Sequence, residues 1–270
     1  MICGLDVGST TCKYVLCAET GEVVARAYER HGSRQAEKVE AFLRDLEAAH
    51  GLTPERDRVV CTGSGAGIVA PLVGARVVQE VVAVAAAVER LHPAVRFVSE
   101  IGGEDMKTVF FQDRAGVRSR QVFMQSACSG GTGTFIEKTA RKLGVLDRLP
   151  EMRYAGYSLH KVSSKCGIFA ETDANSLVKA GVPVEEIIAS LFEAVVYQNL
   201  ATLTKGNTPL PEVLLLGGPN LFFGGLQEAW RTHLQRLWAE RRVPLPTGRD
   251  PASLVTVPAE ALYYAALGGV

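Results

Sequence analysis

Short runs of alternating hydrophobic and polar positions open the chain, and this pattern predicts β-strands joined by tight turns. A period of 3.6 residues follows and predicts an amphipathic helix. The elements expected in this first part are strands over residues 2–7, 13–18, 23–28 and 57–61 and helices over residues 35–50 and 79–92. The first strand carries Asp6 near its end, directly before a turn of small residues.

The same order of patterns returns in the second part of the chain. A strand, a turn of glycines and acidic residues, a strand, a hairpin turn and a third strand follow one another, which we interpret as an internal duplication. The elements expected there are strands over residues 95–101, 107–112, 117–124 and 213–216 and helices starting at residue 136, within 163–171, and over 183–205, 221–241 and 258–268.

The duplication predicts an α/β protein of two lobes. Lobe I is expected to contain residues 1–93 and a returning C-terminal helix over 256–270, and lobe II residues 94–255. Composition supports an ordinary globular chain, because its 270 residues are 47% hydrophobic and 21% charged. A net charge of zero argues against a nucleic-acid surface. With no apolar run of membrane-spanning length and no signal-peptide pattern, we expect a cytoplasmic protein without membrane contact.

Only two of the six cysteines lie in loops rich in glycine and serine. Cys128 precedes Gly131 and a helical pattern, so unpaired backbone N–H groups and the helix dipole there favour a thiolate or an anionic ligand. A glycine-rich turn around an inert cysteine is the structural alternative. The second loop cysteine is Cys166. The other four are interpreted as structural residues, and they are Cys3, Cys12, Cys17 and Cys61.

The turn after the first strand has the residues of a phosphate-binding turn. The small residues Gly8, Ser9 and Thr10 let backbone amides and hydroxyl groups approach a phosphate, while Asp6 faces a hydrated Mg²⁺. A hairpin with a polar turn is the alternative for this stretch alone.

A matching turn, Ile101-Gly-Gly-Glu-Asp105, follows the first strand of the second part. Two glycines again allow close backbone approach, and Asp105, helped by Glu104, is positioned to hold Mg²⁺-bound water or to orient an attacking water. A charged turn without chemistry is the alternative.

A third turn, Gly217-Gly-Pro-Asn220, ends a buried strand and suits a flat ring lying against backbone, so we assign it to adenosine. A glycine required only for steric reasons explains this turn nearly as well. Together the three turns predict a two-lobed ATPase with the nucleotide in the cleft between the duplicated halves. The sequence contains no P-loop, and Gly63-x-Gly-x-Gly67 lacks the spacing of a dinucleotide fold.

The order of these motifs resembles the BadF/BadG/BcrA/BcrD ATPase family, which holds activators of 2-hydroxyacyl-CoA dehydratases and ATPase subunits of benzoyl-CoA reductases. The segments that carry the resemblance are GLDVGSTTCK, IGGEDMK, CSGGTGTF, SSKCGIFAE and LLLGGPN. The resemblance implies an actin/hexokinase-like duplicated ribonuclease H-like fold and a homodimer. It also implies one [4Fe–4S] cluster per dimer, held by Cys128 and Cys166 of each copy.

The resemblance further implies an ATP-driven transfer of electrons from a ferredoxin or flavodoxin to an iron–sulfur dehydratase or reductase. The expected cofactors are therefore ATP or ADP, Mg²⁺ and the cluster. Asp6, Asp105 and Glu104 are the expected catalytic residues, with Asp6 and Asp105 holding Mg²⁺ through water. The residues expected to bind the nucleotide are Gly8, Ser9, Thr10, Lys13, Gly102, Gly103, Gly131, Thr132, Gly133, Gly217, Gly218 and Asn220.

Three departures from the family pattern stand out, namely Glu104 in place of an amide, Ser129–Gly130 in place of two alanines, and Pro219. They resemble the activator modules of long multidomain relatives, so we expect an excised or trimmed module. A sugar or carboxylate kinase of the same superfamily, with Asp105 as base, is the first alternative function. A nucleotide-binding scaffold without turnover is the second.

Overall fold

The computed structural model describes residues 1–114, 116–125, 130–163 and 167–270. The chain forms two compact units, which are treated one at a time. Unit 1 contains Met1–Pro93 and Leu262–Val270, and unit 2 contains Ala94–Ala261.

Unit 1 is built on a five-stranded mixed sheet in the order β3-β2-β1-β4-β5. The central strand β1 pairs antiparallel with β2 and parallel with β4. Its strands are β1 (Ile2–Val7), β2 (Thr11–Cys17), β3 (Val23–Arg30), β4 (Arg58–Thr62) and β5 (Arg76–Val77). Its helices are α1 (Gln35–His50), α2 (Ala66–Val69), the 3-10 helix η1 (Ala70–Val73), α3 (Glu80–Leu91) and α9 (Tyr264–Leu267).

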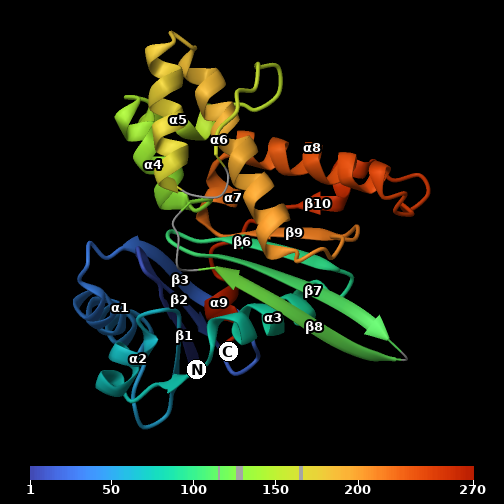
Figure 1. The fold of residues 1–270 in the computed structure, drawn as a ribbon. Coiled ribbons are helices and arrows are strands. Elements are labelled where there is room, and N and C mark those ends of the chain that lie inside the picture. The colour runs from blue at the N-terminus through green and yellow to red at the C-terminus, as the bar shows by residue number, and fades with distance from the viewer. Residues whose placement is uncertain (115, 126–129, 164–166) are drawn as a thin grey trace. The chain divides into compact units, whose positions relative to one another are not determined.

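Unit 2 is built on a second five-stranded mixed sheet, in the order β10-β9-β6-β7-β8. Its strands are β6 (Phe97–Ile101), β7 (Met106–Arg114), β8 (Val117–Gln125), β9 (Val213–Leu216) and β10 (Val255–Thr256). Its helices are α4 (Gly133–Lys142), η2 (Leu146–Glu151), α5 (Gly167–Lys179), α6 (Val184–Gln198), the π-helix η3 (Asn199–Leu203), α7 (Gly218–Phe222), α8 (Gly224–Glu240) and η4 (Pro251–Leu254). Figure 1 labels most of these elements.

The two sheets repeat one topology, which confirms the expected duplication. In each, the first strand in chain order is central, the second and third form an antiparallel meander on one side, and the fourth and fifth add in parallel on the other. The matching pairs in chain order are β1 and β6, β2 and β7, β3 and β8, β4 and β9, and β5 and β10.

Each unit has its own hydrophobic core on one face of its sheet. In unit 1 the inward side chains of β1 and β4 pack with Val39, Phe42 and Leu46 of α1. In unit 2 those of β6 and β9 pack with residues of α6 and α8, including Trp230 and Trp238. Within the described residues, every helix is too short or too polar to cross a bilayer.

The sequence predicted two helices incorrectly. The final helix covers only Tyr264–Leu267 instead of 258–268, because β10 and Pro258 keep the preceding backbone extended or turned. β10 also belongs to the sheet of unit 2, and the chain returns to unit 1 at Leu262 instead of residue 256. The helix expected over 221–241 is divided by Phe223, whose extended backbone separates α7 from α8.

The four cysteines interpreted as structural are buried in the sheet of unit 1. Burial raises the pKa of Cys3 to about 12 and that of Cys61 to about 11, because a thiolate loses its hydration there. The pKa of Cys12 rises to about 11, first through burial and then through the charge of Asp6. These groups therefore remain neutral thiols at physiological pH and behave as small core residues.

Candidate functional site

The first predicted turn brings Asp6 and Lys13 together at the carboxyl end of β1. The two residues are direct partners in the β1–β2 ladder, and Lys13 Nζ lies 2.7 Å from Asp6 Oδ2. Gly8 N–H donates to the Thr11 carbonyl at 3.0 Å, which closes the turn around Ser9 and Thr10. His31 also contacts this turn, because its Nε2 lies 3.2 Å from the Gly8 carbonyl oxygen.

The second oxygen of Asp6 is the unusual feature of this turn. Asp6 Oδ1 is buried and has no hydrogen-bond partner among the residues of unit 1, all of which the structure describes. Burying a carboxylate oxygen without a partner is costly, so the atom is suited to a ligand that supplies hydrogen bonds or positive charge. A hydrated Mg²⁺ fits this requirement, because its water ligands donate to carboxylates.

A glycine turn lies directly against this carboxylate. Gly63 follows β4 with φ +92°, and a Cβ there would lie 2.6 Å from both Asp6 Oδ1 and the Val7 carbonyl oxygen. Gly65 N–H donates to that same carbonyl at 2.8 Å. Gly63 and Gly65 therefore permit close packing of the β4 end on the β1 end.

The second predicted turn, in unit 2, has the same construction. Gly102 N–H donates to the Asp105 carbonyl at 2.8 Å. Lys107 is buried, and its Nζ lies 2.6 Å from Asp105 Oδ2 and 3.7 Å from Glu100 Oε2. Two carboxylates thus surround one buried ammonium group, while Glu104 is exposed at the tip of the turn.

Three of the predicted glycine segments come together within unit 2. Gly133 N–H donates to the Gly102 carbonyl at 2.9 Å and Thr134 N–H to the Gly103 carbonyl at 2.8 Å, so the start of α4 rests on the second turn. A Cβ on Gly217 would lie 2.0 Å from the Ile101 carbonyl oxygen, and one on Gly133 would lie 2.7 Å from Pro219 Cγ. The structure therefore assembles the backbone of three separate motifs into one surface of close-packed turns.

The remaining predicted ligands of this region have defined positions. Gly131 has φ +86°, and a Cβ there would lie 2.9 Å from Gln198 Oε1. Thr132 is buried at the start of α4, and Gly218 is the first residue of α7. Cys128 and Cys166 lie outside the described residues.

Asn220 has a structural role in this arrangement. It is fully buried, and its amide donates to the carbonyls of Leu216 at 2.8 Å and Ser99 at 3.2 Å. Its Oδ1 accepts from Trp230 Nε1 at 3.1 Å. These bonds use the side chain to hold the 217–220 turn against β6 and α8.

Sequence reasoning overlooked Glu100 and Lys107. The strand registers place Lys13 opposite Asp6 and Lys107 opposite Glu100. The two halves of the duplication are offset by 94 residues, so positions 6, 8 and 13 correspond to positions 100, 102 and 107. Glu100 is therefore the counterpart of Asp6, whereas the counterpart of Asp105 is Thr11. The sequence pattern that could have identified Glu100 is an acid two positions before the turn glycine, with a lysine seven positions after that acid. Asp105 was predicted instead because it lies in the turn itself.

Within the residues that the structure describes, no three His, Cys, Asp or Glu side chains are grouped so as to hold a metal ion directly.

The duplicated sheet, with an acid, a glycine turn and a lysine repeated at the same places, defines an actin/hexokinase-like α/β protein. A glucokinase of the ROK family from Streptomyces griseus shares this fold at 12% identity, with a TM-score of 0.53 over 99% of this chain and 96% of that chain. Residues 3–227 match the BadF/BadG/BcrA/BcrD ATPase family, and the chain belongs to this family.

Relatives within the family include proteins with known roles. An activator of lactoyl-CoA dehydratase from Anaerotignum propionicum is 27% identical over 216 residues, which are 80% of this chain and 82% of that protein. The activator of the 2-hydroxyisocaproyl-CoA dehydratase from Clostridium difficile, solved with bound ADPNP, has a TM-score of 0.78 at 24% identity. That likeness covers 99% of this chain and 92% of the other.

Proposed function

We propose that this protein hydrolyses ATP and uses it to activate an acyl-CoA dehydratase or a related reductase. The observation that carries the ATPase assignment is the buried oxygen of Asp6, which has no hydrogen-bond partner within unit 1 and lies beside a glycine turn. The arrangement of acid, turn glycine and lysine recurs at Glu100, Gly102 and Lys107. The activator assignment is supported by the family and by relatives that activate dehydratases.

The phosphates of ATP would bind to backbone N–H groups of the two turns, at residues 9–10 and 103–104, and to the hydroxyl groups of Ser9 and Thr10. Lys13 and Lys107 would balance the negative charge that gathers there, each already held by a carboxylate. Mg²⁺ would be held through water by Asp6. The carboxylates of unit 2 would orient the attacking water and accept its proton.

Cys128 and Cys166 would supply two thiolate ligands, and a second copy of the chain would supply two more, which makes the four that a [4Fe–4S] cluster needs. Such a cluster would provide one-electron chemistry at low potential when bound. The donor would be a ferredoxin or flavodoxin, and the acceptor an iron–sulfur dehydratase or reductase.

Replacing Asp6 with asparagine is expected to lower the rate of phosphate release from ATP by roughly 100-fold, because the neutral amide holds Mg²⁺-bound water poorly. The measurement is a phosphate-release assay at saturating ATP. Asp113→Asn, which removes an exposed ion pair with Arg96, is the control and should leave the rate unchanged. An unaltered rate in Asp6→Asn would refute the assignment of the first turn.

Glu100 of β6 and Glu104 of the second turn are expected to differ in their effect on hydrolysis. Glu100→Gln should lower phosphate release by roughly 100-fold, whereas Glu104→Gln should change it less than about threefold, because only Glu100 occupies the position equivalent to Asp6. The same assay measures both. Equal losses, or a larger loss in Glu104→Gln, would return the catalytic role to the exposed residue that the sequence suggested.

The alternative kinase is separable from the activator by product analysis. A kinase transfers the γ-phosphoryl group to a sugar or carboxylate and releases little free phosphate without that substrate. The activator should release phosphate from ATP alone and should bind iron when reconstituted without oxygen.

A further inference from the structure

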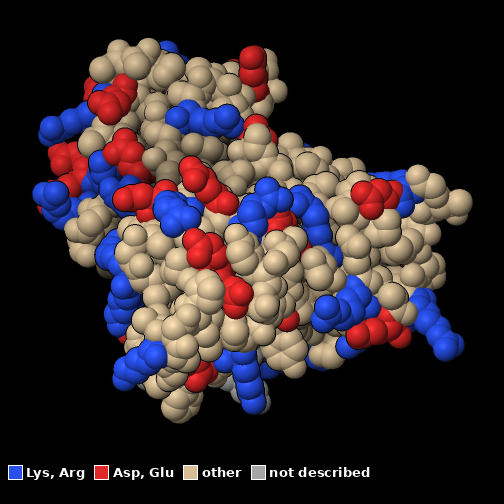
Figure 2. Space-filling model, turned by 90° about the horizontal axis from the view of Figure 1, so that it is seen from above, with Lys and Arg blue, Asp and Glu red and all other residues tan. Residues whose placement is uncertain are grey.

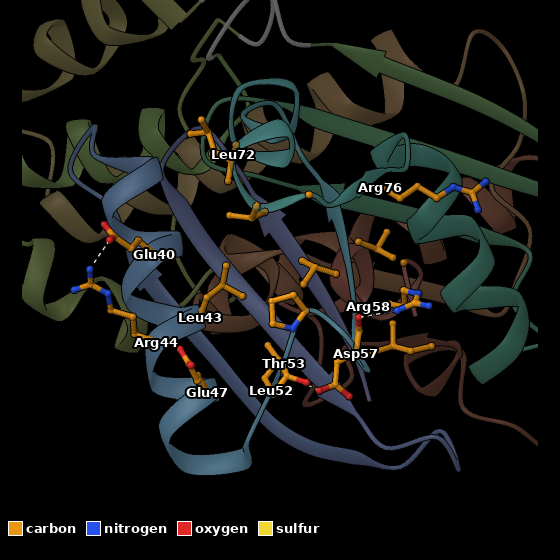
Figure 3. A pocket seen from close by; sticks show the side chains of 18 of the residues that line it. Glu40, Leu43, Arg44, Glu47, Leu52, Thr53, Asp57, Arg58, Leu72 and Arg76 are labelled. Atoms are coloured by element: carbon orange, nitrogen blue, oxygen red, sulfur yellow. Dashed lines mark hydrogen bonds and ion pairs between the residues drawn. The ribbon is translucent and has the colours of Figure 1, made fainter.

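Unit 1 carries a large groove on the face of its sheet that α1 covers. Its volume is about 1120 Å³, above the 300–1,000 Å³ range that is usual for a small-molecule site. One wall is α1, the opposite wall is η1 with the end of α2, and Leu43, Leu52 and Leu72 are among the apolar side chains inside it (Figure 3). The groove is therefore wide enough for a row of side chains on one face of a helix.

The duplication shows what fills the equivalent place in unit 2. On the corresponding face of the second sheet, α8 packs beside α6 and buries Leu226, Trp230 and Leu234 in the core with the side chains of β9. α8 lies between β9 and β10 in the chain. The matching connection in unit 1 lies between β4 and β5, next to α1.

That connection in unit 1 is too short to cover its face. It contains only the four-residue helix α2 and the four-residue η1, compared with 17 residues in α8. Leu72, which lines the groove, is left 70% exposed. A position that one half of the duplicated fold fills with a long amphipathic helix is thus an open apolar groove in the other half.

The charges along the groove indicate what kind of helix would fit. The α1 wall carries Glu37, Glu40 and Glu47, together with Arg44, which is paired to Glu40 at 2.7 Å. Arg58 and Arg76 also line the cavity, but the strand registers place them on the face of the sheet that packs on α9, away from α1. Figure 2 shows charged side chains of both signs distributed over one face of the molecule. The α1 wall is therefore mainly acidic.

We propose that this groove binds an amphipathic α-helix of a partner protein, with an apolar stripe on the floor and basic side chains along α1. The helix would occupy the place that α8 fills in unit 2, by the helix-in-groove mode of recognition. The proposal concerns unit 1 alone and does not depend on ATP hydrolysis or on the cluster.

The chain itself offers a suitable probe, namely a fluorescein-labelled peptide of residues 224–241, cross-linked on its polar face so that it is helical before binding. Fluorescence anisotropy with the full chain should show saturable binding. Leu72→Asp should weaken it at least about tenfold, since a charge then lies in the apolar groove. Val117→Asp, at a 67% exposed position in unit 2, is the matched control and should bind as the native chain does.

Ala36→Trp, which places a bulky ring in the groove from the exposed side of α1, gives an independent test and should also abolish binding. A scrambled peptide should not bind. Absence of binding to the native chain would overturn the proposal. So would binding by Leu72→Asp and Ala36→Trp that is as tight as binding by the native chain. Dimers of the native chain that disappear in Leu72→Asp would also overturn it, because the occupant would then be a second copy.

Discussion

Replacing Gly217 with alanine is expected to destabilise unit 2 by more than about 3 kcal/mol. The residue has φ +87°, a conformation that costs an L-residue about 1–2 kcal/mol. The new Cβ would also lie 2.0 Å from the Ile101 carbonyl oxygen, which is backbone in the central strand of the sheet. The backbone of β6 cannot move away without losing hydrogen bonds to its neighbouring strands. The cost of this steric clash therefore adds to the cost of the positive φ.

Tryptophan fluorescence measures the unfolding of unit 2 itself. The chain has two tryptophans, Trp230 and Trp238, and both are buried in the core of unit 2. Urea unfolding followed through them therefore reports on the unit that contains Gly217. An unfolding midpoint within error of the native value would show that the close approach of the 217 turn to β6 is absent.

Gly248→Ala is the matched control for this substitution. Gly248 also lies in unit 2 and has φ +77°, but a Cβ there would meet no atom within 4 Å. Its cost should therefore be conformational strain alone, about 1 kcal/mol. The difference between the two variants isolates the packing of Gly217 against Ile101.

Replacing Cys166 with serine is expected to abolish iron binding after anaerobic reconstitution while leaving ATP binding largely intact. A hydroxyl group is a poor ligand for a cluster that requires four thiolates, and the loss of one ligand per chain removes two of the four in a dimer. The measurements are iron and acid-labile sulfide per chain, together with nucleotide affinity by calorimetry. Cys128→Ser should behave in the same way.

The control for the cysteine experiment is Cys17→Ala, in which a buried sheet residue of unit 1 loses its thiol. Its iron content should equal that of the native protein. Full iron content in Cys166→Ser would remove the ligand assignment. Loss of iron in all three variants would point instead to a general defect in folding.

Local patterns predicted most of the fold because they depend on neighbours in the chain. The hydrophobic pattern of the first strand predicted β1, and the 3.6-residue period predicted α1. The repeated order of strands and turns indicated the duplication that the sheet topologies confirm. The final helix and the connection through Phe223 were missed, since strand pairing of β10 and the packing of α7 override what a local period favours.

In the candidate site, too, the local features were predicted from the sequence and the long-range contacts were not. Glycine turns after strands were evident from the sequence, and the structure brings the segments at 102, 133 and 217 into contact. Glu100 was missed because its importance appears only when the ladder places it opposite Lys107, as Asp6 is placed opposite Lys13. Asn220 seemed to be a ligand from its position in a turn, yet its hydrogen bonds all lie inside unit 2.

The sequence by itself determined which stretches become strands, where the tight glycine turns fall, and that the whole pattern occurs twice, because these depend on side-chain polarity and backbone freedom over a few residues. The tertiary structure alone decided which acid pairs with which lysine, which carboxylate oxygen remains without a partner, and which face of unit 1 stays uncovered. Those properties arise from contacts between residues far apart in the chain, whose distances no local pattern contains.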